Sequence, residues 1–203
     1  LLAPALSVAL CRAFGVTGLA HDVLIVETAM PVVTQTVVAA AEYGAALDLR
    51  LCDGLRGIAP HEADTLVMAG MGGETIIQIL TDSPWPRTSG CTLLLQPQTK
   101  VELLRRWLSE NGYACRDERL VWDKGKLYVV LQMAAGEAFT PEEARLYAGF
   151  CLENDPLYGD YLDAQLRRLR RRLEGLHRSR EDADCGTLPE LIAALEKKKE
   201  ALS

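Results

Sequence analysis

The stretch from Asp64 to Gly73 constrains this chain more than any other. Thr65 to Ala69 is a short apolar run of the kind that forms a buried parallel strand. It opens into three glycines within four residues, and the following residues, 74–80, carry apolar side chains at helical spacing. A glycine-rich turn between a parallel strand and a helix is where α/β proteins bind small ligands, although such a turn can also be a tight connection that binds nothing.

Strand-like and helix-like segments alternate from residue 20 to about 110, which is typical of βα units around a parallel sheet. Pro31 begins a helix that Gly44 ends, and Gly112 ends another helix that starts near Lys100. Besides residues 65–69, the expected strands are 22–27, 47–51 and 91–96.

Two further strand-like runs, 118–122 and 126–133, flank Asp123-Lys-Gly125, which predicts a β-hairpin. A parallel sheet that ends in an antiparallel hairpin is the edge arrangement of class I S-adenosylmethionine (SAM) methyltransferases. The predicted fold class is therefore α/β, with a Rossmann-like methyltransferase sheet.

From Thr140 onward the chain is expected to be wholly helical. Leucines recur at steps of four and three residues, at Leu162, Leu166, Leu169, Leu173 and Leu176, and a returning apolar face comprises Leu191, Ile192, Leu195 and Leu202. The pattern predicts an antiparallel helical hairpin over residues 137–203, after a methyltransferase domain over 1–136. Its cluster of arginines suits phosphate contacts, or only keeps a coiled coil hydrated.

Composition excludes several other classes of protein. Hydrophobic residues make up 49% of the 203 and charged residues 25%, as in ordinary globular domains, and no apolar run approaches the length of a membrane span. The six cysteines are scattered, and neither they nor the three histidines have metal-ligand spacing. Free thiols in a reducing cytoplasm and no bound metal are therefore expected.

Two acids lie at the ends of predicted strands, at the edge where ligands bind in such sheets. A carboxylate such as Glu27 suits the two hydroxyls of a ribose, and Asp53 can accept a hydrogen bond from the exocyclic amine of adenine. Both beside a glycine turn favour an adenosine-containing cofactor, although either acid alone could be a helix cap. No catalytic triad or Cys-His pair is evident, which fits methyl transfer, since alignment of the reactants does most of the work there.

Several motifs in this order resemble the bacterial tRNA (adenine(22)-N1)-methyltransferase family, TrmK. They are Asp53-Gly-Leu55, Ala69-Gly-Met-Gly-Gly73, Leu94-Leu-Gln-Pro97, residues 104–113 and Lys124-Gly-Lys-Leu-Tyr128. The resemblance implies a SAM-dependent enzyme that methylates N1 of an adenine in the D-loop region of tRNA. It also implies a helical C-terminal arm that clasps the tRNA.

The resemblance further implies roles for individual residues. The cofactor would be bound by Glu27, Asp53, Gly54, Ala69 and Gly70. The catalytic region and the base pocket would comprise Met71, Gly72, Gly73, Gln96 and Pro97, with Met71 able to pack against a flat ring. The tRNA would be contacted by Arg167, Arg168, Arg170, Arg171 and Arg172.

The family's first strand and its acidic-Gly-x-Asp-His signature have no counterpart here. The chain is therefore expected to be N-terminally incomplete, with the strands that end at Glu27 and Ala69 lacking the partner between them. One alternative is a non-catalytic RNA-binding protein derived from a methyltransferase. Another is an NAD-dependent oxidoreductase, which the terminal hairpin and the missing G-x-G-x-x-G disfavour. A cytoplasmic monomer is expected.

Overall fold

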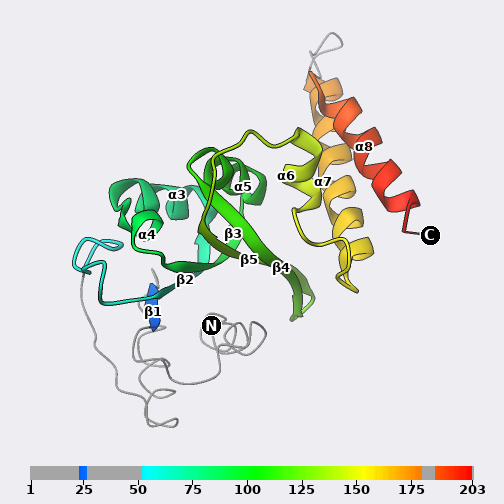
Figure 1. Ribbon diagram of the computed structural model, residues 1–203. Coiled ribbons are helices and arrows are strands. Elements are labelled where there is room, and N and C mark those ends of the chain that lie inside the picture. Colours follow the sequence, from blue (N-terminus) through cyan, green and yellow to red (C-terminus); the bar gives the residue numbers. More distant parts are fainter. Residues whose placement is uncertain (1–22, 27–51, 180–185, 203) are drawn as a thin grey trace.

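The computed structural model describes residues 23–26, 52–179 and 186–202, and within these ranges a mixed sheet forms the centre of the molecule (Figure 1). Its strand order is β1-β2-β3-β5-β4. The strands β1 (Val23–Val26), β2 (Thr65–Gly72) and β3 (Thr92–Thr99) are parallel. The hairpin of β4 (Tyr113–Asp123) and β5 (Lys126–Ala135) completes the sheet, with β5 antiparallel to β3 and β4 at the edge. The predicted fold class is confirmed.

Helices α3 (Gly73–Asp82) and α5 (Val101–Glu110) follow β2 and β3 and lie side by side on one face of the sheet (Figure 1). Each carries an apolar stripe that is buried against the strands, as helical spacing requires. The short helix α4 (Trp85–Thr88) precedes β3 and was not predicted. The helix expected near Lys100 is confirmed as α5, and Gly112 follows it with φ +76°.

Three helices, α6 (Glu143–Ala148), α7 (Tyr158–Ser179) and α8 (Leu188–Glu200), form a C-terminal arm that packs beside the hairpin (Figure 1). The predicted helical hairpin corresponds to α7 and α8. On α7, Leu162, Leu166 and Leu169 are buried, as the leucine repeat predicts. The prediction of a wholly helical segment is wrong, because residues 149–157 connect α6 to α7 without helix and Gly149 has φ +99°.

Leu202 does not belong to the apolar face of α8. It lies beyond the last helical residue and is 47% exposed, whereas Leu191, Ile192 and Leu195 are buried as predicted. Because the helix ends at Glu200, residue 202 no longer lies on the helical face that packs against α7.

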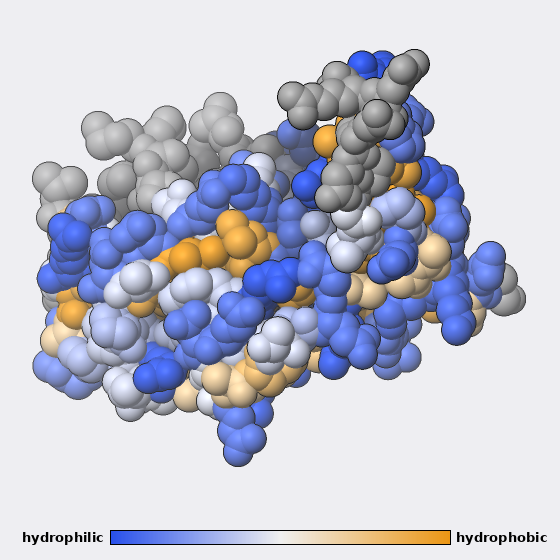
Figure 2. Space-filling view, turned by 90° about the horizontal axis from the view of Figure 1, so that it is seen from above, coloured by the Kyte–Doolittle hydropathy of each residue, from blue (hydrophilic) through white to orange (hydrophobic). Residues whose placement is uncertain are grey.

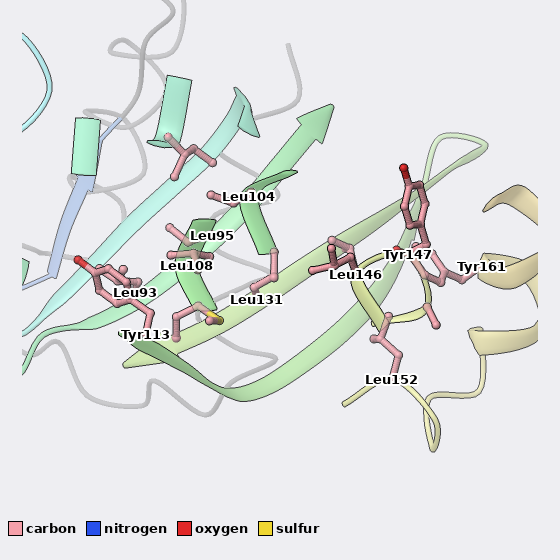
Figure 3. Close-up of a cluster of buried hydrophobic side chains, with 14 of the residues drawn as sticks. Leu93, Leu95, Leu104, Leu108, Tyr113, Leu131, Leu146, Tyr147, Leu152 and Tyr161 are labelled. Atoms are coloured by element: carbon pink, nitrogen blue, oxygen red, sulfur yellow. The ribbon is translucent and has the colours of Figure 1, made fainter. Parts of the chain in front are cut away.

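One continuous group of buried side chains runs from the sheet into the arm (Figure 3). Leu93, Leu95 and Leu131 come from strands, while Leu146 and Tyr161 come from α6 and α7. The division at residue 136 therefore remains a prediction, since the arm shares the core of the sheet.

The strands expected to be left without a partner pair directly with each other. Val23–Val26 lies in parallel register with Thr65–Met68, and this pairing satisfies backbone groups that would otherwise be unbonded. The helix from Pro31, the strand 47–51 and Glu27 lie outside the described residues.

The outer face of α3 and α5 carries an apolar patch within a hydrophilic surface (Figure 2). Ile77, Leu103 and Trp107 line an open groove there, whose rim includes Glu74, Arg106 and Glu110. Among the described helices, none combines the length and apolar character needed to cross a membrane.

Candidate cofactor and substrate site

The candidate site lies where β2 and β3 end side by side. Ala69 is opposite Gln96, Met71 is opposite Pro97, and Gly72 is opposite Thr99. The register shifts twice along this stretch, between Ala69 and Met71 and again before Gly72. Such irregularities re-aim the backbone at a strand end, and they are common next to active sites.

A single hydrogen bond joins the two most specific motifs of the sequence. The backbone N–H of Gly70 donates to Oε1 of Gln96 over 2.9 Å, and Nε2 of Gln96 faces the carbonyl of Pro97 at 3.3 Å. The Gln96 side chain is completely buried, and Gly70 has φ +80°, a conformation that glycine adopts without strain. Gln96 therefore holds the bulged end of β2 in place.

The glycines at 72 and 73 allow the two strand ends to approach each other. A Cβ atom on Gly73 would lie 2.7 Å from the carbonyl oxygen of Lys100, and one on Gly72 would lie 3.2 Å from Oγ1 of Thr99. The predicted boundary after Ala69 is wrong, because β2 continues to Gly72 and α3 begins at Gly73.

Met71 does not present its side chain for contact with a flat ring. It is only 3% exposed and belongs to the hydrophobic core. Bulges on both sides of Met71 leave the neighbouring glycines, and not this side chain, at the surface of the strand end.

Asp53 and Gly54 form one wall of a cavity of about 150 Å³ beside α3. Thr75, Gln78 and Asp82 of α3 also line it. Asp53 is exposed, and its Oδ2 lies 3.5 Å from Nη1 of Arg56, so the carboxylate retains further acceptor positions. Gly54 adopts φ +58° and packs against Ile79, which closes the base of the turn.

Sequence reasoning missed the polar residues that α3 contributes. Thr75 and Gln78 line the cavity, and Glu74 forms a 2.5 Å ion pair with Lys100, the residue that links β3 to α5. Thr75, Gln78 and Asp82 are at i, i+3 and i+7, so their shared helical face could have been read from the sequence. The distance of this face from Asp53 in the chain hid the association of the two.

The five arginines predicted to bind RNA fall into two groups. Arg168 pairs with Glu102 at 3.1 Å and lies over the ring of Tyr147, while Arg170 pairs with Glu196 at 2.6 Å. The other three, Arg167, Arg171 and Arg172, are exposed, and none has an ion-pair partner among the described residues. In that part of the chain no cluster of three His, Cys, Asp or Glu side chains suits a metal ion.

Comparison with known families identifies the kind of domain to which these residues belong. The family model described as a methyltransferase domain matches residues 16–131, which is more than half of the chain. The chain belongs to this methyltransferase family. Its match includes the bulged end of β2, the cavity beside α3 and the Gln96 contact.

Individual relatives point to the same family. The tRNA (adenine(22)-N(1))-methyltransferase of Bacillus subtilis is 35% identical over 116 residues, which cover 57% of this chain and 47% of that protein. The chain thus spans about half the length of this curated relative.

Two solved structures share the fold. The structure of B. subtilis TrmK superposes with a TM-score of 0.61 at 25% identity, covering 89% of this chain and 79% of that one. The Mycoplasma capricolum TrmK complex with S-adenosylhomocysteine gives 0.66 at 16% identity, covering 89% and 81%. The similarity to TrmK indicated by the motifs is confirmed.

Proposed function

We propose that this chain is a SAM-dependent methyltransferase that acts on N1 of an adenine in tRNA, at position 22. The observation that carries the proposal is the hydrogen bond from Gly70 to Gln96, which joins the Ala-Gly-Met-Gly-Gly and Leu-Gln-Pro motifs at one strand edge. The similarity to the B. subtilis enzyme over 116 residues supports the choice of tRNA and of adenine N1.

The residues beside α3 fit the adenine end of the cofactor. The cavity is smaller than a site for a whole drug-sized ligand, and it combines the Asp53 carboxylate with apolar Leu55 and Ile79. A purine ring suits this mixture, with its exocyclic amine donating to Asp53. Glu27 would bind the ribose, and Ala69 and Gly70 would border the rest of the cofactor. When bound, SAM supplies a methyl group made electrophilic by the sulfonium.

The residues of this chain would act mainly by alignment. N1 of adenine has a free lone pair, so that no general base is needed before it attacks a methyl group. Gln96 acts as a positioning residue, because its amide is committed to Gly70 and Pro97. Gly72, Gly73 and Pro97 then shape the base pocket, and positioning of this kind accounts for much of the rate enhancement in transfer reactions.

The arm would bind the tRNA backbone. Arg167, Arg171 and Arg172 are available for phosphates, while Arg168 and Arg170 fasten α7 to α5 and α8. This division gives the arm a rigid support as well as a charged surface. A cytoplasmic monomer with a methyltransferase unit over 1–136 and a tRNA-binding unit over 137–203 completes the proposal.

Calorimetric titration of SAM, followed by a methyl-transfer assay on tRNA with mapping of the modified base, tests the proposal. Asp53→Ala should abolish SAM binding, whereas Asp64→Ala, which removes an exposed acid at the opposite end of β2, should leave it unchanged. A folded chain that binds tRNA but neither SAM nor S-adenosylhomocysteine would contradict it and would identify a non-catalytic RNA-binding protein.

A further inference from the structure

Trp122 is the most exposed large apolar side chain among the described residues, at 60%. It lies near the tip of the β4–β5 hairpin, two residues before the Lys124-Gly125 turn. Tryptophan is highly buried on average, and the large apolar surface of an exposed indole is available for a partner to cover.

The strand geometry explains why this tryptophan is not covered by the arm. Glu118, Leu120 and Trp122 alternate onto the same face of β4, and the first two are buried. The backbone N–H of Leu120 donates to Oδ2 of Asp155, in the connection between α6 and α7. Trp122 occupies the next position on the same face of the strand, two residues after Leu120, where that connection no longer covers it.

The hairpin tip points toward the edge of the sheet that carries the candidate site. Leu95 of β3 is opposite Leu131 of β5, and the two strands are antiparallel. From this pair, β3 continues to Thr99 and β5 runs back to Lys126, so that both reach the same edge. At about 3.3 Å per residue, the tip extends at least as far as the end of β3.

Two lysines lie close to Trp122 at the hairpin tip, together with Asp123, which is opposite Lys126 in the strand register. Lys124 and Lys126 are exposed, and neither forms an ion pair with any acid in the described part of the chain. Lys124 and Gly125 have φ +46° and +78°, values typical of a two-residue hairpin turn that holds its side chains at the extreme end. An exposed indole close to two lysines that form no ion pair within the described residues matches the sites that stack unpaired bases and contact the adjoining phosphates.

We infer that the hairpin tip is a second RNA contact, in which Trp122 stacks on an unpaired base of the substrate and Lys124 and Lys126 bind the neighbouring phosphates. The inference rests on the proposed function, and it adds a point of substrate recognition outside the arm. The tip and the arm would hold the RNA on two sides of the strand edge at which methylation takes place.

Fluorescence anisotropy tests this assignment, with a short labelled oligoadenylate, a blunt RNA duplex of equal length, and tRNA as probes. Trp122→Ala should weaken oligoadenylate and tRNA binding by about tenfold, with a smaller effect on the duplex, whereas Trp122→Phe keeps most of the affinity. The double variant Lys124→Ala/Lys126→Ala should lower the slope of log K against log salt by about 0.7 per lysine, while Trp122→Ala leaves that slope unchanged.

Two variants control for nonspecific effects. Leu202→Ala removes exposed apolar surface at the end of α8, and Arg116→Ala removes a charge from the far end of the same hairpin. Both should bind as the unaltered protein does. Equal affinities for Trp122→Ala and the unaltered protein would overturn the inference, as would a changed sedimentation coefficient with unchanged RNA affinity, which would make the tip a protein contact. Methyl transfer by the unaltered protein, measured alongside, separates this failure from failure of the proposed function.

Discussion

Arg105 of α5 and Glu118 of β4 form an ion pair in which both side chains are completely buried, with Nε of the arginine 2.7 Å from Oε1 of the glutamate. Nη1 of Arg105 donates to the carbonyl of Leu146 and to the hydroxyl of Tyr161. Oε2 of Glu118 accepts from the backbone N–H groups of residues 150 and 151. This pair therefore ties the sheet to α6, to α7 and to the start of the connection between them.

Removing one partner should be strongly destabilising. Burial by itself lowers the pKa of Arg105, but Tyr161 and Glu118 together raise the pKa above its ordinary value, so the guanidinium stays charged. Glu118→Gln would leave that charge uncompensated, and we expect a loss of about 3–5 kcal/mol in the free energy of unfolding, measured by urea denaturation.

The matched control is Glu143→Gln, which removes the partner of Arg106, the next residue on α5. That ion pair is partly exposed, so the change should stay within about 0.5 kcal/mol. Similar losses for both variants would mean that the buried pair has no special role in holding the arm.

The sequence predicts the sheet and its hairpin because local patterns determine them, as in the apolar run from Thr65 and the Asp123-Lys-Gly125 turn. It also places Gln96 and Gly70 at one edge, since parallel strand ends meet there. Contacts between distant segments are harder to predict. Arg105 and Arg106 look alike in sequence, yet only Arg105 falls within the stripe of Leu104 and Leu108, and its partners come from β4, α6 and α7.

Gly73→Ala should damage the strand edge. Its Cβ would meet the backbone oxygens of Lys100 and Thr99 at 2.7 and 3.0 Å, and backbone atoms cannot move aside as a flexible side chain does. We expect the free energy of unfolding to fall by several kcal/mol (about 1–3 from overpacking alone), together with weaker SAM binding.

Gly175→Ala is the control, because that position on α7 faces open space and alanine should stabilise the helix by up to about 1 kcal/mol. Equal stabilities of the two variants would refute the close approach.

Cys115 and Cys151 should form a disulfide on mild oxidation. Their Sγ atoms lie 3.8 Å apart, one on β4 and the other in the connection after α6. Diamide would take two electrons and two protons from the thiols as the S–S bond forms. Burial raises the pKa of both thiols, so the thiolate is scarce at neutral pH and the reaction should be faster at pH 9 than at pH 7. Peptide mapping should recover the linked pair, and Cys115→Ser should abolish it; a product that joins other cysteines instead would contradict the packing of the arm against β4.

Alkaline pH should weaken the protein through Tyr158, at the start of α7. Burial raises the pKa of Tyr158 to about 12, with the charge of Glu153 adding to the shift. In the unfolded chain a tyrosine ionises near pH 10. Between these values the folded state holds more protons than the unfolded state, so stability is fully present below about pH 10 and falls as the pH rises toward 12. Urea denaturation at a series of pH values measures the slope. Tyr158→Phe should make it shallower, and the part that remains includes Tyr113, Tyr147, Cys115 and Cys151, whose pKa values burial also raises. An unchanged slope in the variant would show that Tyr158 ionises alike in the folded and unfolded chain, contrary to its burial at the start of α7.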